Sequence, residues 1–370
     1  MKYDTKMSLA DLGLNAFFEA QMRDHEFPGG SLARVVAEYK EAYRVRGVNG
    51  EFLARVTGKH RFIATTREDY PAVGDWVSIE ELPEEMAIIW GILPRKTLLK
   101  RKRSLSRKTT VSDGFKQEEQ IIAANIDSAF IVESLDRDYN LNRLERYLVL
   151  VTEGNITPVI ILNKADLIPQ AELELRVSQI QGRLGSIHVI ATSVIKDQGL
   201  DELRRYIETG KTYCFLGSSG VGKSSLINKL LGTEEIKTRA ISLSVERGRH
   251  TTTTREMYFL ETGGIVIDNP GTREVGITNA DTGLNTVFNE INRLSRKCKY
   301  SDCSHSNEPG CAVLRAVAEE QIDRDQYDNY IKLKAESAFY SLTDVEKRNK
   351  DRKFGQFLKK AKTSLKNSYE

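Results

Sequence analysis

The stretch TYCFLGSSGVGKSSLINKLL, residues 212–231, decides the fold of this 370-residue chain. Its first five residues are apolar and predict a buried strand, and its last eight have the apolar spacing of a helix. Between them, the pattern G-x-x-x-x-G-K-[ST] is satisfied by Gly217, Gly222, Lys223 and Ser224. A chance glycine turn is the alternative, and the strand and helix on its two sides argue against it. The sequence therefore predicts a phosphate-binding loop in an α/β domain.

The chemistry of this loop follows from its residue types. Glycines let backbone N–H groups approach phosphate oxygens where a Cβ would clash, and the following helix points the positive end of its dipole at the same place. We expect Lys223 to reach the β- and γ-phosphates and the hydroxyl of Ser224 to bind Mg²⁺. The nucleotide contacts expected from the loop are Gly217, Ser218, Ser219, Gly220, Val221, Gly222, Lys223, Ser224 and Ser225.

A second motif, the tetrapeptide NKAD at 163–166, ends another apolar run. Guanine presents two adjacent N–H donors that the carboxylate of Asp166 can accept together, and adenine lacks this pair. Asn163 can bond the other edge of the base, and the alkyl stem of Lys164 can lie on its face. Alone, this tetrapeptide also fits a solvated loop; beside a phosphate-binding loop it predicts guanine recognition. The expected base contacts are Asn163, Lys164, Asp166 and, from a loop after a third strand, Ser193 and Val194.

The two motifs stand in an unusual order, because the guanine motif precedes the phosphate-binding loop along the chain. In most GTPases the phosphate-binding loop opens the domain. The order predicts a circularly permuted domain, whose ordinary ends are joined inside the chain. Its new ends lie beside the segments that sense the γ-phosphate, so whatever follows those segments is mechanically attached to them.

Two further segments are expected to sense the γ-phosphate and Mg²⁺. Asp268, in DNPG at 268–271, ends a predicted strand and can hold Mg²⁺ through water, and Gly271 can donate its N–H to the γ-phosphate. The segment GRHTTTT at 248–254 supplies hydroxyls as the first switch. One of three residues there is expected to bind Mg²⁺, and the sequence leaves the choice open: Thr251, Thr252 or Thr253.

Position 272 bears on the hydrolytic step, because small GTPases place a glutamine there to orient the attacking water. This chain has Thr272, so another group must orient the water. His250, inside the first switch segment, is the nearest candidate. A surface-loop histidine without a role is the alternative.

A cluster of metal-binding residue types follows the switch segments. Three thiolates and one imidazole within fourteen residues match a closed Cys₃His zinc site: Cys298, Cys303, His305 and Cys311. Disulfides are the alternative. However, the remaining cysteine, Cys214, lies in a predicted core strand, and the polar N-terminal residues lack a secretory signal. All four ligand positions are filled, so we expect one structural Zn²⁺ that holds a small domain together.

The first hundred residues are rich in short β-type segments, spaced about ten to twelve residues apart. The five predicted strands are YRVRGV, FLARVTG, RFIATT, WVSIEEL and AIIWGIL. Five such strands fit a small barrel of the OB type, which commonly binds oligonucleotides. A barrel that serves only as a spacer or as a protein-docking module is the alternative.

The net charge of +3 conceals two basic blocks. Residues 95–108 hold eight Lys and Arg and no acid, and residues 347–370 hold nine against two acids. Such clusters predict a phosphate-rich partner, RNA above all, although a solvated tail is the alternative for the second block. The sequence has no apolar run of membrane-spanning length and no lipidation signal. We therefore expect a cytoplasmic protein without membrane contact, and a monomer.

Taken together, these motifs resemble those of the ribosome-small-subunit-dependent GTPase A family (RsgA, also called YjeQ). The resemblance rests on the motif order, GRHTTT, DNPG and the C-x4-C-x-H-x5-C spacing, and on PAVGDWV at 71–77 and ILPRKTLLKR at 92–101. It runs from about residue 35 to the C-terminus, so residues 1–34 exceed the simplest members. It implies late maturation of the small ribosomal subunit as the function, hydrolysis stimulated by that subunit, and His250 as the catalytic group.

We therefore expect a multidomain α/β protein with five parts. They are an N-terminal extension (1–34), an OB-fold β-barrel (35–103), a circularly permuted P-loop GTPase domain (104–284), a C-terminal helical zinc-binding domain (285–346) and a basic tail (347–370). Expected ligands and partners are GTP or GDP with Mg²⁺, one Zn²⁺, and the small ribosomal subunit with its rRNA. Two other functions fit the same motifs: a permuted GTPase for another RNA or ribosomal target, and a nucleotide-gated RNA-binding module with negligible turnover.

The first prediction concerns His250→Ala. This variant should bind GTP and the small subunit nearly as well as the wild type, because the side chain would touch the attacking water and not the bound nucleotide. Subunit-stimulated hydrolysis should fall by about 10²-fold or more, the usual effect of a positioned polar group that acts in the transition state. Multiple-turnover phosphate release measures it. Unchanged stimulated turnover would mean that the catalytic group comes from elsewhere, most simply from the ribosome.

Overall fold

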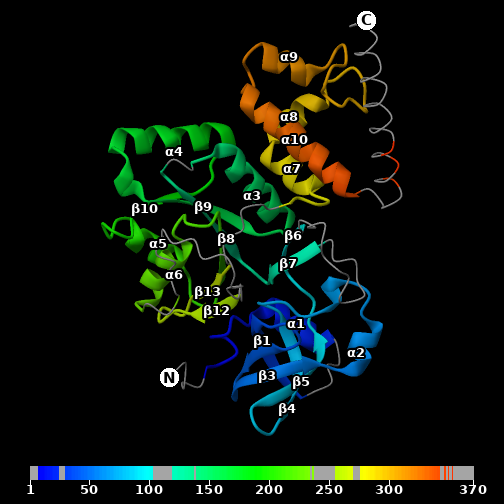
Figure 1. The fold of residues 1–370 in the computed structure, drawn as a ribbon, viewed down its shortest axis with the longest axis vertical. Helices are drawn as coiled ribbons and strands as arrows, with labels where there is room; N and C mark the ends of the chain where they lie inside the picture. Colours follow the sequence, from blue (N-terminus) through cyan, green and yellow to red (C-terminus); the bar gives the residue numbers. More distant parts are fainter. Residues whose placement is uncertain are drawn as a thin grey trace, which may run out of the picture. The chain divides into compact units, whose positions relative to one another are not determined.

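The structure is a computed structural model, and it describes residues 7–24, 30–102, 119–136, 139–233, 255–269 and 276–341, with the single residues 236, 346, 349 and 352. The chain divides into two compact units, Met1–Val275 and Gly276–Glu370 (Figure 1). Several predicted functional residues lie outside the described residues: His250, Thr251, Thr252, Thr253, Gly271 and Thr272.

Five strands close into a barrel within the first unit. Their order is β1 (Ser31–Glu38), β2 (Tyr43–Gly47), β3 (Gly50–Val56), β5 (Met86–Ile92) and β4 (Trp76–Leu82), and β4 pairs back onto β1. The inward side chains form one apolar core, which includes Val45, Ile79 and Ile89. The expected OB-type barrel is therefore confirmed, since this order with a closing β1–β4 pair leaves no open edge in the barrel.

One of the five predicted strands is wrong. The first half of the segment RFIATT at 61–66 lies in a helix, α2 (Gly58–Ile63), and the rest is not a strand. The barrel's remaining strand is β1, which the sequence did not predict. The Thr57 side chain accepts the N–H of His60 at 3.1 Å and caps the helix, and this local bond outweighs the β preference of the residues. The sequence did not predict β1, because Ala33–Ala37 are buried on both faces of the strand and apolar and polar residues therefore do not alternate.

The other half of the first unit is an α/β sheet with the order β10-β9-β8-β11-β13-β12. Its strands are β8 (Ser128–Ser134), β9 (Thr157–Asn163), β10 (Val189–Thr192), β11 (Thr212–Leu216), β12 (Glu256–Phe259) and β13 (Ile265–Asp268). Only the β12–β13 pair is antiparallel within this group. Its helices are α3 (Leu141–Glu153), α4 (Gln170–Leu184), α5 (Leu200–Tyr206) and α6 (Lys223–Leu231), and short 3-10 turns lie at Arg67–Asp69 and Ala165–Leu167.

Two contacts join the barrel to this sheet. Strand β12 pairs with barrel strand β1 at Glu256 and Ala37, which makes one continuous eleven-stranded sheet. A two-stranded ribbon, β6 (Leu98–Lys102) with β7 (Glu119–Ala124), leads from the barrel into the α/β part. The barrel and the α/β sheet thus share both strand pairing and covalent connections (Figure 1).

A buried arginine ties these parts together. Arg34, on β1, is only 1% exposed, and its guanidinium bonds four acceptors. These are the carbonyl oxygens of Leu12, Gly74 and Asn125 and the hydroxyl of Thr212, at 2.6, 3.3, 3.2 and 2.8 Å. Burial lowers the pKa of Arg34 to about 10, so it remains charged at neutral pH. One side chain therefore satisfies polar groups from the N-terminal segment, the barrel and the α/β sheet.

The N-terminal extension packs against the barrel. Residues 7–24 contain α1 (Ala16–Asp24), and the ring of Phe18, buried at 2% exposure, lies 6.0 Å from that of Trp76. Leu12 is fully buried beside Arg34. This stretch, whose role the sequence left open, is thus part of the barrel's core packing.

The second unit is helical, as expected. It contains α7 (Asp281–Val287), α8 (Asn289–Ser295), α9 (Ala312–Ala318) and α10 (Arg324–Ser341), and Phe288 packs against Tyr330 of α10 with ring centroids 5.3 Å apart. The loop between α8 and α9 carries the four predicted metal ligands. Within the described stretches of the chain, no helix combines the length and apolar character needed to cross a membrane.

The second prediction concerns Arg34→Met. It should lower the free energy of unfolding of the first unit by about 2–4 kcal/mol, because four buried acceptors lose their donor. Urea unfolding followed by the fluorescence of buried Trp76 measures it. Arg34→Lys keeps the charge but cannot reach all four acceptors, so its free energy of unfolding should lie between those of the wild type and Arg34→Met. A methionine variant that unfolds at the wild-type urea midpoint would contradict this account of Arg34.

Candidate nucleotide site and metal-ligand cluster

Four predicted motifs meet at one edge of the α/β sheet. Strand β9 ends at Asn163, β10 at Thr192, β11 at Leu216 and β13 at Asp268. These strands run parallel, so their carboxyl ends lie together. Ligands of open α/β sheets bind at this edge. The structure therefore brings together segments of the chain that are up to about a hundred residues apart in sequence.

The glycines of the phosphate-binding loop are required by close backbone approaches. Gly217 has φ +143°, and a Cβ there would lie 2.3 Å from the carbonyl oxygen of Val132. Gly222 has φ +100°, and a Cβ there would lie 2.2 Å from Nδ2 of Asn163. Neither position can accept a side chain without a shift of its neighbours.

Asn163 bridges the guanine motif and the phosphate-binding loop. Its Nδ2 donates to the carbonyl oxygen of Val221 at 2.8 Å, and its Oδ1 accepts the hydroxyl of Thr192 at 3.1 Å. Sequence reasoning gave Asn163 a contact with the base; the amide here bonds within the protein and holds the loop. Thr192, fully buried, was not foreseen, because a threonine that ends a strand has no distinctive pattern.

The remaining guanine-motif residues are fixed by short polar contacts. The hydroxyl of Ser193 donates to Oδ1 of Asp166 at 2.5 Å and also accepts the N–H of Lys196 at 3.1 Å. Lys164 adopts the left-handed conformation, with φ +62°, and its ammonium lies 2.8 Å from Oδ2 of Asp136. Asp136 was also missed; its place two residues after the end of β8, at the same edge, was the available signal.

Lys223 is buried inside its own loop. It is 6% exposed, and its ammonium donates to the carbonyl oxygens of Gly217 and Ser218 at 2.9 and 2.8 Å. Burial lowers the pKa of Lys223 to about 8, and the nearby Asp268 opposes this shift. Its two partners are neutral carbonyl oxygens, and anionic oxygens would form stronger hydrogen bonds with the ammonium.

Asp268 is a half-buried carboxylate with unused bonding capacity. Burial raises its pKa, against the lowering effects of the Lys223 ammonium and of a hydrogen bond from Ser224. Its Oδ1 atom is buried and has no hydrogen-bond partner among the described residues. Such an oxygen beside a serine hydroxyl fits a hydrated divalent cation, whose ligands are oxygens.

The second unit contains one group of side chains that could hold a metal ion. The ligand atoms of Cys298, Cys303, His305 and Cys311 all lie within 4.8 Å of one another. Sγ of Cys298 lies 3.8 Å from Sγ of Cys311, and both are 3.6 Å from Nδ1 of His305. These spacings match the edges of a tetrahedron with zinc–ligand bonds of about 2.0–2.3 Å and greatly exceed a disulfide bond of about 2.05 Å.

The protein around this cluster favours the metal-binding forms of Cys298 and His305, whereas burial raises the pKa of Cys303 to about 11. Backbone N–H groups of Ala312 and Val313, at the start of α9, bond the Cys298 sulfur. Tyr327 donates its hydroxyl to the backbone oxygen of His305 at 2.6 Å, which ties α10 to the ligand loop. Burial lowers the pKa of His305, so the imidazole is neutral at pH 7, the form that binds metals. The fourth cysteine, Cys214, is fully buried in β11, as expected of a core residue.

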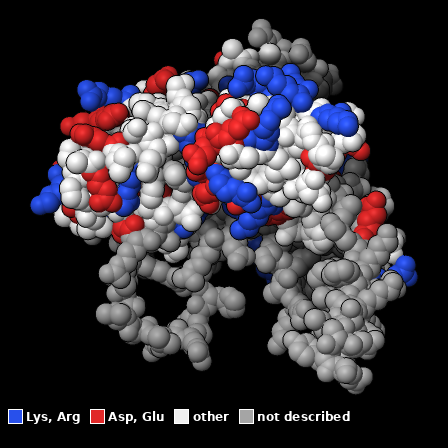
Figure 2. All heavy atoms as spheres, turned by 90° about the horizontal axis from the view of Figure 1, so that it is seen from above, with Lys and Arg blue, Asp and Glu red and all other residues white. Residues whose placement is uncertain are grey.

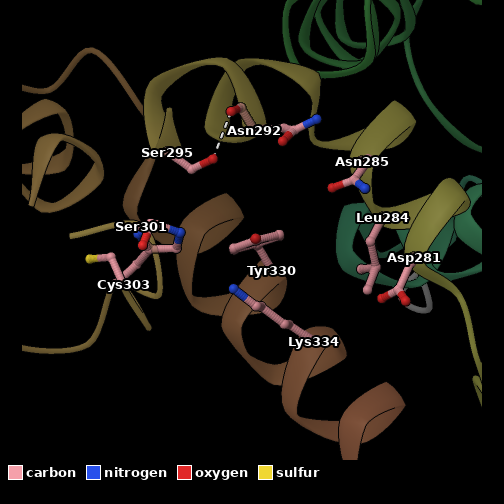
Figure 3. Close-up of a pocket in the computed structure, with 10 residues that line it drawn as sticks. Asp281, Leu284, Asn285, Asn292, Ser295, Ser301, Cys303, Tyr330 and Lys334 are labelled. Atoms are coloured by element: carbon pink, nitrogen blue, oxygen red, sulfur yellow. Dashed lines mark hydrogen bonds between the residues drawn. The ribbon is translucent and has the colours of Figure 1, made fainter. Parts of the chain in front are cut away.

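A polar hollow of about 190 Å³ lies beside the cluster (Figure 3). Figure 3 shows the amides of Asn285 and Asn292 and the ammonium of Lys334 around the ring of Tyr330. Its walls come from α7, α8, α10 and the ligand loop, so all of it lies within the second unit.

Figure 2 shows how charge is distributed on one face of the molecule. Lysine and arginine side chains alternate with aspartate and glutamate over the described part of that face. Of the two basic blocks predicted from the sequence, residues 103–108 of the first and nearly all of 347–370 lie outside the described residues.

The fold and site define a class: a GTPase with a P-loop in circularly permuted order. Comparison with known proteins agrees. The RsgA GTPase family matches residues 93–278, and a 50S ribosome-binding GTPase family matches residues 212–362. The solved structure of YjeQ from Thermotoga maritima is 26% identical, covers 82% of this chain and 96% of its own, and has a TM-score of 0.58. YloQ, titled a circularly permuted GTPase, shows the same fold at 24% identity and a TM-score of 0.55.

Two curated relatives are similar over nearly the whole chain. The small ribosomal subunit biogenesis GTPase RsgA 2 of Lactiplantibacillus plantarum is 39% identical over 360 residues, 96% of this chain and 98% of its own length. The RsgA protein of Syntrophotalea carbinolica is 39% identical over 337 residues, 91% of each chain. This chain belongs to the RsgA GTPase family, and the resemblance drawn from its motifs is confirmed.

The third prediction concerns the pH dependence of GTP binding. Because burial lowers the pKa of Lys223 to about 8, part of the free protein lacks this proton above that pH. Bound phosphates would raise the pKa of Lys223 again, so GTP binding should take up a proton at high pH, approaching one proton per GTP near pH 9. The affinity for GTP should therefore fall as the pH rises through about 8. Calorimetry in buffers of different ionisation enthalpy measures the uptake. Lys229→Gln, which changes an exposed lysine, should behave as the wild type; uptake absent at pH 9 would contradict the prediction.

Proposed function

We propose that this chain is a GTP hydrolase that binds the small ribosomal subunit and acts in its late maturation, with hydrolysis stimulated by the subunit. The observation that carries the proposal is the bond from Asn163 to the carbonyl of Val221, which joins the guanine motif and the phosphate-binding loop into one site. Membership of the RsgA GTPase family and the names of the relatives supply the ribosomal target. We further propose a cytoplasmic monomer.

In this proposal, the base and the phosphates have separate recognition elements. Asp166 accepts both guanine donors, Lys164 covers the base, and the turn containing Ser193 and Val194 supports it. Lys223 exchanges its two carbonyl partners for β- and γ-phosphate oxygens, which restores the stability of its charge. Backbone N–H groups of the loop surround the phosphates, from Ser218, Ser219, Gly220, Val221, Gly222, Ser224 and Ser225.

Magnesium fits the described part of this site. The hydroxyl of Ser224 and the unpartnered Oδ1 of Asp268 supply oxygen ligands, directly or through water. When bound with GTP, the ion would neutralise charge that develops on the phosphates. A hydroxyl from Thr251, Thr252 or Thr253 is proposed to complete the set, with Gly271 donating its N–H to the γ-phosphate and His250 orienting the attacking water.

The first switch segment adjoins residues that contact the barrel, so the nucleotide state can affect the barrel. The first switch segment ends where β12 begins, and the first described residues after it, Arg255 and Glu256, contact the barrel. Arg255 lies 3.8 Å from Glu38, and Glu256 lies 3.5 Å from Arg44 and pairs with β1. A rearrangement of the switch on hydrolysis would therefore act on the strand pair that joins barrel and sheet, and so on subunit binding.

We also propose that Cys298, Cys303, His305 and Cys311 bind one structural Zn²⁺. The closeness of the four ligand atoms, which all lie within 4.8 Å of one another, and the N–H groups directed at Cys298 support this. The helices that flank the ligand loop, α8 and α9, have only seven residues each, so the ion would supply much of the stability of this unit.

The function is tested with GTPase assays in which purified small or large subunits are added. Small subunits should stimulate turnover, and large subunits should not. Asp166→Asn should weaken GTP binding by about 2–4 kcal/mol, because the amide replaces one of the two acceptor oxygens with an NH2 donor that faces a guanine donor. It should gain binding to xanthosine triphosphate, whose base replaces the exocyclic amine with an oxygen, so that subunits stimulate hydrolysis of this nucleotide instead.

Other outcomes favour the two alternatives. Stimulation by a different RNA or particle would retain the GTPase and replace its target. Nucleotide-dependent RNA binding without multiple turnover under any condition would favour a nucleotide-gated binding module. Binding of ATP as tightly as GTP would overturn the reading of residues 163–166.

The fourth prediction concerns the metal. One Zn²⁺ per chain should co-purify, and its removal by a chelator should unfold mainly residues 285–341 while GTP binding survives in the first unit. Elemental analysis and hydrogen exchange with and without chelator measure this. Cys214→Ser, outside the cluster, should retain the full metal content. Metal-free protein with a folded second unit would contradict the proposal.

A further inference from the structure

The helix α2 exposes two large apolar side chains, one of them aromatic, to solvent. Phe62 is 91% exposed and its neighbour Ile63 is 61% exposed, although both are large apolar residues. Isolated exposed apolar residues are common, but an almost fully exposed phenylalanine beside a second apolar residue marks a contact surface. The barrel core does not use either side chain.

Helix α2 is held firmly on its inner side. The Thr57 hydroxyl caps its start, and Nε2 of His60 donates to the carbonyl oxygen of Asp69 at 2.6 Å. The His60 ring also packs edge-on against Tyr70, with centroids 5.8 Å apart, and Ala64 after the helix is buried. The exposure of Phe62 is therefore fixed by an anchored turn.

Two basic residues of α2, Lys59 and Arg61, lie near the ring of Phe62 in the helix. Lys59, Phe62 and Ile63 stand at positions i, i+3 and i+4 and so share one face of the helix. Lys59 and Arg61 are exposed, and the structure gives neither a partner among the described residues.

The nearby acids are already bonded. Glu68 lies 2.8 Å from the ammonium of Lys100. The Asp69 carboxylate accepts the N–H groups of Thr65 and Thr66 at 2.7 and 2.8 Å. The face of α2 thus combines one free cation, Lys59, with an aromatic ring, and Arg61 adds a second free cation on the other side of that ring. An aromatic ring with cations beside it is the pairing that stacks on a base and binds phosphate.

We propose that Phe62 stacks on an unpaired RNA base, with Lys59 and Arg61 bonding the adjacent phosphates. This inference rests on the proposed function, because the RNA would be that of the small subunit. It places an RNA contact on the helix between β3 and β4, outside the barrel strands. An apolar pocket of a protein is the alternative occupant, which the experiments below distinguish; two unpaired cations beside the ring favour a phosphate-bearing chain.

Three substitutions of Phe62 separate these occupants. Phe62→Trp keeps an aromatic face and should bind small subunits within about twofold of the wild type. Phe62→Ala and Phe62→Leu should both weaken binding by about tenfold or more, the usual effect of losing one stacked base. Binding is measured by sedimentation with a non-hydrolysable GTP analogue. GTP affinity should be unchanged in all three, because Phe62 lies outside the nucleotide site.

Charge is tested separately. Lys59→Gln should reduce the slope of log affinity against log salt concentration by about one, since one phosphate contact is lost. A photoreactive benzophenone side chain at position 62 should cross-link to RNA in the bound particle. Cross-links only to ribosomal protein, wild-type binding by Phe62→Leu, or wild-type binding by Phe62→Ala would each overturn the inference.

A second probe keeps this inference distinct from the proposed function. Wild-type protein and Phe62→Ala are compared on a single-stranded oligoribonucleotide of mixed sequence. If the wild type fails to bind small subunits but binds this RNA in a Phe62-dependent way, the proposed function fails and the stacking site stands. If the wild type binds subunits and Phe62→Ala binds equally well, the function stands and the stacking site fails. If the wild type binds neither, both fail.

Discussion

The close contact between Asn163 and the turn at Val221–Gly222 is the constraint on which the nucleotide site depends. The amide of Asn163 lies against the glycine Cα so closely that any Cβ there would be 2.2 Å from Nδ2. It bonds the carbonyl of Val221 on one side and the hydroxyl of Thr192 on the other. The carboxyl ends of β9 and β10 and the phosphate-binding loop after β11 are thereby held together. The residues proposed to recognise the base and those proposed to recognise the phosphates are therefore directly bonded to one another.

Circular permutation connects this edge of the sheet to the neighbouring parts of the protein. The chain enters the α/β sheet through the strands that precede and carry the guanine motif, and it leaves the sheet after β12 and β13, which flank the segments proposed to sense the γ-phosphate. Strand β12 pairs with the barrel, and the segment after β13 leads directly into the helical unit. The two segments proposed to sense the γ-phosphate, 248–254 and 268–271, are thus each close in sequence to an element outside the nucleotide site. Arg34 supports this arrangement, because it bonds the barrel and the first residue of β11, Thr212, at the opposite end of that strand from the phosphate-binding loop.

Buried charges in the first unit differ in their partners. Arg34 is buried with four hydrogen-bond acceptors, which fix the packing of several segments, although burial still lowers its pKa. Lys223 and the half-buried Asp268 have less complete partners: Lys223 bonds two carbonyl oxygens, and Oδ1 of Asp268 has no hydrogen-bond partner among the described residues. Incomplete satisfaction of this kind is typical of ligand sites, since the missing partner arrives with the ligand. The hydrogen-bond partners, and not the pKa shifts, distinguish these two residues from Arg34.

The sequence by itself determined the nucleotide chemistry, the permuted order, the metal-ligand set and most of the α/β elements, because each depends on short patterns whose physics is local. Glycine spacing, strand periodicity and Cys–His spacing are such patterns. It failed for residues 61–66, whose first half belongs to a helix that begins after the cap at Thr57. It failed also for β1, which is buried on both faces and so does not alternate apolar and polar residues. Only the tertiary structure decided that Asn163 bridges to the loop, that Asp136 and Thr192 join the site, and that Phe62 faces solvent. These outcomes depend on contacts between residues distant in sequence, which no local pattern encodes.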